Sequence, residues 1–272
     1  MEWGEAHGLL MMVKLPEPTL SLFRASEAVT AVIPAYNEAR YIGDVLNVLT
    51  QVADLSQIIV VDDGSHDDTA SLVQERSTLD ARIELIRLPQ NRGKASALFI
   101  GTDAANNDLI LFLDADLMQL RPAHIPLLIN PVRREGYGMT LGVFQHGRWQ
   151  TDLTHRCFPF LSGQRCVRWS LFQEVFRDEP VQWGVETAFN LHAWYHRYPV
   201  QHVPWFGVTH ATRAEKQEGF SGYWSHVKMW WQIGSYTMRF LLSHGWRPKV
   251  PVSKRRSSRA RLATSKYDIQ GS

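Results

Sequence analysis

The chain has 272 residues, 44% of them hydrophobic, which allows one large domain or two small ones with a sizeable core. A formal net charge of +2 favours no particular partner, and we expect no nucleic-acid partner. Two cysteines are too few for a disulfide framework, which favours a reduced, cytoplasmic protein. No apolar run approaches the roughly 18 to 20 residues that a membrane span needs.

The two ends of the chain differ from the rest. Residues 1–28 show no clear hydrophobic period, and we expect them to form an N-terminal extension. Residues 249–272 hold seven basic residues and one acid, a net charge of +6 that leaves −4 for the remainder. This composition predicts a basic, disordered tail.

From residue 29 onward, short apolar runs alternate with amphipathic segments. The expected strands are 29–34, 57–65, 82–88 and the run that begins at Leu109. The third alternates as a strand near a sheet edge does. The expected helices are 42–49, a segment after the possible capping residues Asp67 and Asp68, and 95–106. This rhythm predicts a parallel sheet with right-handed crossovers.

After residue 116 the rhythm loosens. The expected helices are 120–134, 170–176 and a segment from about 183 to 196. The expected strands are 138–144 and 200–208, the last ending at Thr209 and His210. Residues 145–168 are mixed, and 218–244 predict an aromatic-rich helix or pair of helices.

The stretch from Leu109 to Leu117 carries the strongest chemical signal. Five apolar residues run directly into Asp114 and Asp116, as in a strand that is buried on both faces and ends in carboxylates. Open α/β sheets bind ligands at such strand ends. Side chains at i and i+2 of an extended segment point the same way, and paired carboxylates suit Mg²⁺ or Mn²⁺. The alternative is a strand end followed by an acidic turn.

Four short motifs follow one another along the first half of the chain. They are Val32-Ile33-Pro34-Ala35-Tyr36-Asn37-Glu38, Val60-Val61-Asp62-Asp63-Gly64-Ser65, Asn91-Arg92-Gly93-Lys94 and Leu113-Asp114-Ala115-Asp116. In order and spacing they resemble family 2-like glycosyltransferases, over about residues 29–210. The resemblance implies the GT-A fold, an α/β architecture with a mostly parallel central sheet flanked by helices.

Three further features resemble glucosyl-3-phosphoglycerate synthases and related nucleotide-sugar enzymes. They are Gly93-Lys94, Gly184-Val185-Glu186 and the late histidine His210. Those enzymes have a longer chain with a different middle. The Gln-x-x-Arg-Trp motif of processive synthases is not met, because one residue too many separates Gln164 from Arg168. This departure argues against a cellulose- or chitin-type synthase.

The resemblance implies a nucleoside site at the first two strand ends. The residues that would hold the nucleoside are Pro34, Ala35, Tyr36 and Glu38. The Glu38 carboxylate would accept hydrogen bonds from ribose hydroxyls, or else be a solvated glutamate in a first helical turn. Asp63 would contact a base N–H, whereas Asp62 could hydrogen-bond the following turn.

The diphosphate and its metal would lie beside these groups. Lys94 would meet the diphosphate and offset the charge of the leaving group, or else be an exposed lysine. Asp116 would bind the metal, and Asp114 would bind it too or contact ribose or a metal-bound water. His210 could complete the coordination, since imidazole suits Mn²⁺ better than Mg²⁺. The alternative is a structural histidine at a strand end.

On the acceptor side the resemblance points to Glu186, preceded by Gly184. In an inverting enzyme Glu186 would be the general base, and in a retaining one it would position substrate. The alternative is an ordinary glutamate in the first turn of a helix. Ser162, Gly163 and Arg165 would form a loop over the sugar or acceptor, where Arg165 could bind an acceptor phosphate bidentately or be a surface arginine.

The aromatic-rich segment near the C-terminus could contact a membrane surface. Its apolar residues are Trp224, Val227, Trp230, Trp231, Met238, Leu241 and Leu242, with Lys228 and Arg239 between them. Aromatic and cationic residues followed by a basic tail suit an anionic bilayer. The alternatives are packing on the core or on the mate in a homodimer.

We therefore expect a metal-dependent glycosyltransferase that uses a nucleotide-diphosphate sugar, most simply a UDP-sugar, with Mg²⁺ or Mn²⁺. Its catalytic domain would cover 29–215, divided into a donor half, 29–117, and an acceptor half, 118–215, followed by a helical segment at 216–248. The acceptor would be a small phosphorylated or carboxylated molecule or a lipid phosphate, and peripheral membrane contact is left open. The alternatives are a nucleotidyltransferase and an inactive membrane or nucleic-acid adaptor.

Overall fold

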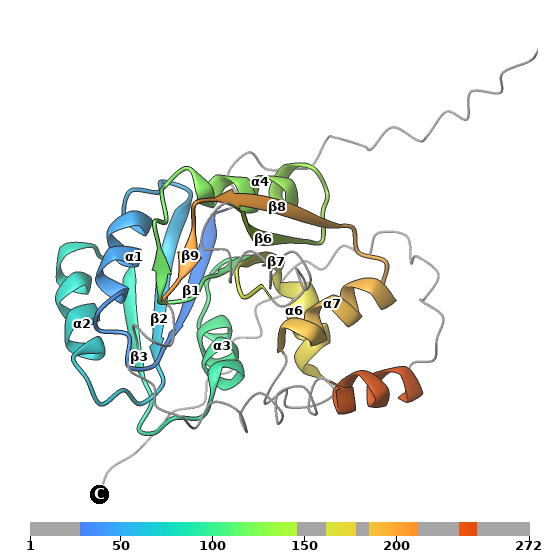
Figure 1. Cartoon of the computed structure of the whole chain (residues 1–272), viewed down its shortest axis with the longest axis horizontal. Helices are drawn as coiled ribbons and strands as arrows, with labels where there is room; N and C mark the ends of the chain where they lie inside the picture. The colour runs from blue at the N-terminus through green and yellow to red at the C-terminus, as the bar shows by residue number, and fades with distance from the viewer. Residues whose placement is uncertain (1–27, 146–161, 178–184, 212–233, 244–272) are drawn as a thin grey trace, which may run out of the picture.

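A seven-stranded sheet runs through the part of the chain that the computed structural model describes, which is residues 28–145, 162–177, 185–211 and 234–243 (Figure 1). Its strands lie in the order β3-β2-β1-β4-β7-β6-β8. Their bounds are β1 (Val29–Ala35), β2 (Leu55–Asp62), β3 (Ile83–Arg87), β4 (Leu109–Phe112), β6 (Met139–Gln145), β7 (Arg165–Arg168) and β8 (Val200–Phe206). β1 to β4 are parallel, which confirms the predicted mostly parallel sheet.

Helices cover both faces of this sheet, and each face has its own hydrophobic core. The helices are α1 (Ile42–Leu49), α2 (Thr69–Leu79), α3 (Lys94–Asp103), α4 (His124–Arg134), α6 (Trp169–Arg177) and α7 (Val185–Tyr195). Successive residues of β1 alternate between the cores. Ala31 and Ile33 belong to the core that includes residues of α1, α2 and α4, whereas Val32 belongs to the core that includes residues of α3, α6 and α7. Burial on both faces explains why β1, β2 and β4 are apolar runs.

β3 is the edge strand that its alternating pattern predicts. Two helix boundaries differ from expectation. α3 ends at Asp103 rather than 106, because the Asn106 N–H donates to the Gln57 side chain and leaves the helical path. α4 begins at His124 rather than 120, because a separate turn closes when the His124 N–H donates to the Arg121 carbonyl.

The capping of α2 also differs from expectation. Asp68 stands at the N-cap position but makes no side-chain cap hydrogen bond. The Asp67 carboxylate instead accepts from the Thr69 N–H at 3.0 Å. Of the two residues expected to cap this helix, only Asp67 therefore satisfies one of its first backbone donors.

β7 is the strand that the sequence pattern misses. Residues 165–168 lie within a segment that we expected to be mixed, yet they pair antiparallel with both β4 and β6. This very short run, Arg165-Cys166-Val167-Arg168, has two apolar residues between two charged ones and shows no strand alternation. Only pairing with distant strands identifies such a segment as part of the sheet.

A second, two-stranded sheet brings the late histidine to the donor half. The expected last strand is split, because Gly207 adopts φ +79° and separates β8 from β9 (Thr209–His210). β9 pairs antiparallel with β5 (Leu117–Met118), so that His210 lies opposite Leu117. The chain segment after Asp116 is thereby fixed beside His210.

The C-terminal helical segment is described only over residues 234–243, where it is a helix (Figure 1). Its Phe240 ring lies 4.9 Å from the His192 ring and 5.8 Å from the Tyr195 ring of α7. The described residues include no helix that is both long and apolar enough to cross a membrane. The predicted extension, the tail and the tryptophans at 224, 230 and 231 lie outside the described residues.

The packing of α3 on the sheet predicts a stability effect at Gly101. A Cβ at this position would lie 2.5 Å from Val32 Cγ1 and 2.9 Å from Val61 Cγ2. Although alanine is the better helix former by up to about 1 kcal/mol, overpacking costs about 1–3 kcal/mol. We expect Gly101→Ala to lower the free energy of unfolding measured with urea.

Gly43→Ala in α1 is the matched control for this substitution. Its Cβ would meet nothing closer than Arg76 Nη2 at 3.8 Å, so we expect the free energy of unfolding to stay the same or to rise. If both variants changed stability alike, the close approach of α3 to the sheet would be contradicted.

Candidate active site

The predicted site residues gather at the C-terminal ends of three neighbouring strands. β1 lies between β2 and β4, and the three are parallel. Their ends therefore meet at one edge of the sheet, where the chain leaves β1 toward Glu38, β2 toward Asp63 and β4 toward Asp114. This edge is the place that the fold offers for a ligand.

Asp114, Asp116 and His210 form one cluster at this edge, and their ligand atoms lie within 4.8 Å of one another. His210 Nδ1 lies 3.1 Å from Asp116 Oδ1, and His210 Nε2 lies 3.7 Å from Asp114 Oδ2. Two carboxylates and an imidazole fit a divalent cation of the Mn²⁺ or Mg²⁺ kind. The structure thus brings together the three predicted metal ligands.

The electrostatics of the cluster favour a charged histidine when no cation is bound. Burial alone would lower the pKa of His210, but the hydrogen bond with Asp116 and the charges of both carboxylates raise it. The Phe144 ring packs edge-on against the imidazole, with ring centroids 4.8 Å apart. A bound cation would compete with the proton on His210, because a metal needs the neutral imidazole.

Lys94 links the donor half to the acceptor half. Its Nζ lies 2.7 Å from Asp114 Oδ1 and 3.0 Å from Glu186 Oε1. Burial alone would lower the pKa of this ammonium, but the two carboxylates outweigh it and raise the pKa above its ordinary value. Burial would likewise raise the pKa of Asp114, yet Lys94 and His210 hold it well below its usual range. Lys94 therefore remains a cation at physiological pH.

Asp63 fixes the loop that carries Lys94. Its carboxylate accepts from the Arg92 N–H and from the Gly93 N–H, both at 2.8 Å. Gly93 precedes α3 with φ +90°, which glycine adopts readily. Asp62 accepts from the Ser65 N–H at 3.1 Å and so bonds the following turn, as expected. A base contact for Asp63 stays a prediction beside this structural role.

Hydrogen bonds join the loop after β1 to the loop after β2. The Asn37 N–H donates to Ser65 Oγ at 2.9 Å, and the His66 N–H donates to Asn37 Oδ1 at 2.9 Å. The Glu38 N–H donates to Thr69 Oγ1 at 2.8 Å. The backbone beside the predicted nucleoside residues is thus held by the segment that follows β2. The sequence does not reveal this contribution.

Gly163 and Gln164 adjoin the Lys94–Asp114 pair, and Ser162 contacts Gln164. A Cβ at Gly163 would lie 2.6 Å from Asp114 Oδ2 and 2.7 Å from Lys94 Nζ, so only glycine fits without displacing the pair. The Gln164 side-chain amide donates to Asp114 Oδ2 at 2.7 Å. Sequence reasoning assigned roles to residues 162, 163 and 165 but gave none to Gln164, which it considered only for the Gln-x-x-Arg-Trp motif that is not met.

Arg165 lies inside the protein rather than in a loop. It begins β7, its side chain is buried, and its guanidinium donates to the backbone carbonyls of Ser162 and Glu186. The same group lies over the Phe189 ring, 5.3 Å from its centroid. Burial lowers the pKa of Arg165 to about 10. These contacts join the turn at 162 to the first turn of α7, and the predicted phosphate contact stays a prediction.

Comparison with known proteins identifies the family. The model of glycosyl transferase family 2 matches residues 30–203. The chain belongs to this family. The GT-A fold that the four motifs imply is thereby confirmed, and Glu38, Asp114 and Glu186 all lie within the matched range.

Two kinds of curated relative share part of this family 2 chain. An undecaprenyl-phosphate 4-deoxy-4-formamido-L-arabinose transferase of Proteus mirabilis is 36% identical over 123 residues, 43% of this chain and 37% of the relative. A glucosyl-3-phosphoglycerate synthase of Mycobacterium tuberculosis is 27% identical over 140 residues, 50% of this chain and 43% of the relative. The matched part spans about two fifths of the length of these relatives.

Solved structures agree on the fold. Glucosyl-3-phosphoglycerate synthase from Mycobacterium tuberculosis, in complex with Mn²⁺, uridine diphosphate and glucosyl-3-phosphoglycerate, matches with a TM-score of 0.58 at 22% identity. The match covers 86% of this chain and 87% of that one. The same enzyme in complex with Mg²⁺ and uridine diphosphate matches with a TM-score of 0.56.

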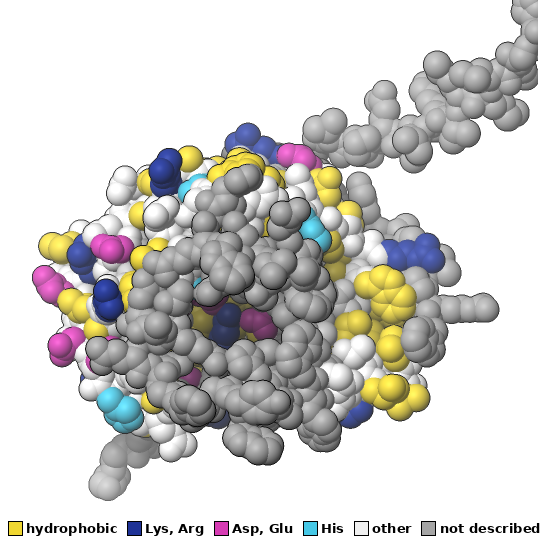
Figure 2. All heavy atoms as spheres, viewed as in Figure 1, with side chains coloured by type: hydrophobic (Ala, Val, Ile, Leu, Met, Phe, Trp, Pro, Cys, Tyr) yellow, Lys and Arg dark blue, Asp and Glu magenta, His cyan; other side chains and the backbone are white. Residues whose placement is uncertain are grey.

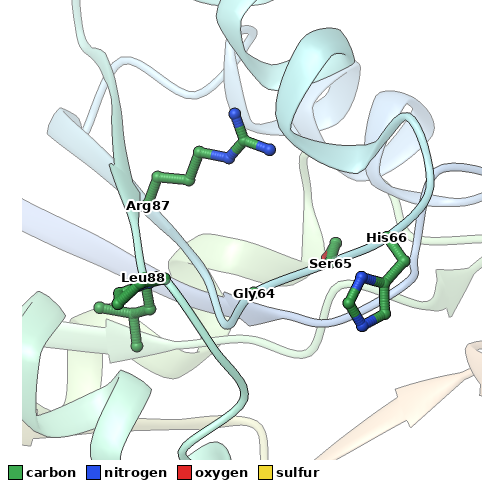
Figure 3. A pocket seen from close by; sticks show the side chains of 6 residues that line it. Gly64, Ser65, His66, Arg87 and Leu88 are labelled. Atoms are coloured by element: carbon green, nitrogen blue, oxygen red, sulfur yellow. The ribbon is translucent and has the colours of Figure 1, made fainter.

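A pocket of about 290 Å³ opens beside the donor edge of this family 2 sheet, at the ends of β2 and β3 (Figure 3). Its lining residues are Gly64, Ser65, His66, Arg87, Leu88 and Pro89. The His66 ring lies 6.4 Å from the ring of Tyr36, which is 40% exposed. The pocket therefore adjoins the predicted nucleoside residues rather than the Asp114–His210 cluster.

Gly184 lies outside the described residues.

The Lys94 bridge predicts a pH-dependent stability effect. Without metal, Lys94→Met leaves Asp114 and Glu186 facing each other, and we expect the free energy of unfolding at pH 7 to fall by about 1–2 kcal/mol. This is less than for a fully buried pair, because the Lys94 side chain is 40% exposed. The lowered pKa of Asp114 contributes stability that is complete above about pH 4 and is lost as pH falls.

The difference in free energy of unfolding between the Lys94→Met variant and the native chain should therefore become smaller below about pH 4. It would be measured from urea unfolding curves recorded with EDTA. Arg92→Met is the control, because this exposed cation lies two residues earlier and only its backbone contacts Asp63. An equal loss in both variants, or a difference that does not change with pH, would contradict the bridge.

Proposed function

We propose that this chain is a metal-dependent glycosyltransferase that moves a sugar from a nucleotide-diphosphate donor, a UDP-sugar, to a phosphorylated acceptor. The observation that carries this proposal is the convergence of Asp114, Asp116 and His210 beside Lys94, at the strand ends of a family 2 fold. The solved relatives were bound to Mn²⁺ or Mg²⁺ together with uridine diphosphate, which supports the same donor chemistry here.

The chain's own residues would divide the work between them. Asp114, Asp116 and His210 would hold the cation, which supplies positive charge to the diphosphate as it leaves. Lys94, kept protonated by its two carboxylates, would add a fixed positive charge on the same side. The nucleoside would be held beside the adjoining pocket by Pro34, Ala35, Tyr36 and Glu38.

Glu186 would meet the acceptor. It stands in the first turn of α7, and its carboxylate lies 3.0 Å from the Lys94 ammonium. The relatives' names specify a phosphoglycerate acceptor in one case and undecaprenyl phosphate in the other, which supports a phosphorylated acceptor. Because one carboxylate oxygen of Glu186 is already paired with the Lys94 ammonium, we expect Glu186 to position the acceptor hydroxyl through a hydrogen bond.

Peripheral membrane contact and a homodimer remain proposals. Met238 and Leu242 are 60% and 78% exposed, stand one helical turn apart, and flank Arg239. Hydrophobic side chains gather on this part of the face shown in Figure 2, where Figure 1 shows the helix. A cytoplasmic location stays a prediction. Membership of family 2 speaks against the alternative of a nucleotidyltransferase.

The donor site can be tested by calorimetric titration of UDP and GDP into the full chain, with Mn²⁺ and then with EDTA. We expect UDP to bind only with Mn²⁺. The Asp116→Ala variant should lose this binding, because it lacks one of the three proposed ligands of the cation. Asp103→Ala, which removes an exposed carboxylate at the end of α3, should bind as the native chain does. Absence of nucleotide binding under every condition would overturn the transferase proposal.

The membrane contact can be tested by co-sedimentation with vesicles that contain anionic phospholipid. Leu242→Glu should weaken binding roughly tenfold, because a buried leucine contributes about 1.5–3 kcal/mol and a glutamate is repelled by the surface. Leu79→Glu is the control, because Leu79 is 75% exposed at the far end of α2. Equal binding by both variants would contradict a contact through this helix.

A further inference from the structure

Gln164 is a buried amide that contacts the predicted cation site. Its exposed fraction is 0%, and its side-chain nitrogen lies 2.7 Å from Asp114 Oδ2. A neutral amide at this distance donates a hydrogen bond to the carboxylate without changing the net charge of the cluster. No motif considered above assigns a role to this residue.

β6 and the preceding turn hold the amide in place. The Gln164 carbonyl accepts from the Gly142 N–H of β6 at 2.8 Å. The Ser162 hydroxyl lies 2.5 Å from the Gly142 carbonyl and 3.1 Å from the side-chain oxygen of Gln164. A Cβ at Gly142 would lie 3.2 Å from the Gln164 Cβ, so the two segments pack closely. The amide therefore has a fixed position before any ligand arrives.

The carboxylate of Asp114 is held at both of its oxygens. Oδ1 faces the Lys94 ammonium, and Oδ2 accepts from Gln164. Oδ2 is also the oxygen that lies 3.7 Å from His210 Nε2, and so it faces the cluster. If the amide were absent, the carboxylate could rotate toward Lys94 and turn this oxygen away from His210.

We propose that Gln164 is a positioning residue that sets the orientation of Asp114 for the cation. This inference rests on the proposed function, because it concerns the same cation site. It places the turn at 162–164 on the donor side of the site. Gln164 itself touches neither the cation nor the sugar; it acts through the orientation of Asp114 Oδ2.

The test compares Gln164→Met with Gln57→Met in the full chain. Methionine has nearly the same length and shape as glutamine but donates no hydrogen bond. Gln57 is a matched control, because it is 4% exposed and its amide donates to Glu84 Oε1 at 2.9 Å, near the opposite ends of the strands. Both variants lose a hydrogen bond from a buried amide to a carboxylate, and only one of these bonds adjoins the cation site.

Two quantities would be measured on each variant: Mn²⁺ affinity in the presence of UDP, from the spin-resonance signal of free Mn²⁺, and the melting temperature. We expect Gln164→Met to bind Mn²⁺ about 10- to 100-fold more weakly, the usual effect of removing a partner that orients a ligand. Gln57→Met should lose at least as much melting temperature, because the Gln57 side chain also accepts from Thr30 and from the Asn106 N–H, and it should keep the native Mn²⁺ affinity.

The outcomes separate this inference from the proposed function. If the native chain binds no Mn²⁺ with UDP, the proposed function fails, and this inference fails with it. If the native chain binds and Gln164→Met binds equally well, only the positioning role is overturned. If Gln164→Met does not fold, Gln164→Asn retains the amide on a shorter side chain. Weaker Mn²⁺ binding by that folded variant supports the proposal, and unchanged binding overturns it.

Discussion

The arrangement of the site depends on the Lys94 ammonium, which lies between the carboxylates of Asp114 and Glu186. Lys94 begins α3, Asp114 follows β4 and Glu186 lies in the first turn of α7, so the Lys94 ammonium joins three separate elements. Without that ammonium the carboxylates would repel one another, and the two halves of the domain would lose one of the charged contacts between them. Figure 2 shows a basic and an acidic side chain side by side near the centre of the face that holds these elements.

The Lys94 bridge to Asp114 and Glu186 is supported from both sides by hydrogen bonds. Two backbone N–H groups bound by Asp63 fix the loop before Lys94, and the amide of Gln164 holds Asp114. Gly163 leaves room for the pair, since any larger residue would meet both of its members. The cost of collecting charged groups in a partly buried place is thus offset by dense hydrogen bonding around them.

The sequence predicts the parts of the fold that depend on local pattern. Long apolar runs such as those of β1 and β2 are visible because both of their faces are buried, and Asp114 and Asp116 are visible because they end such a run. β7 is not visible, because its four residues become a strand only by pairing with β4 and β6. Gln164 and the Ser65–Asn37 contact escape notice for the same reason: their roles lie in partners far away in the chain.

The donor half and the acceptor half of the domain are less independent of each other than the sequence suggests. The donor half supplies Lys94 and Asp114, but the acceptor half supplies Glu186, Gln164 and His210, which contact or adjoin them. A chimera joined near residue 117 would therefore have to exchange these residues as a matched set. In this chain, recombination of donor and acceptor halves would be limited by these shared contacts rather than by the backbone of the sheet.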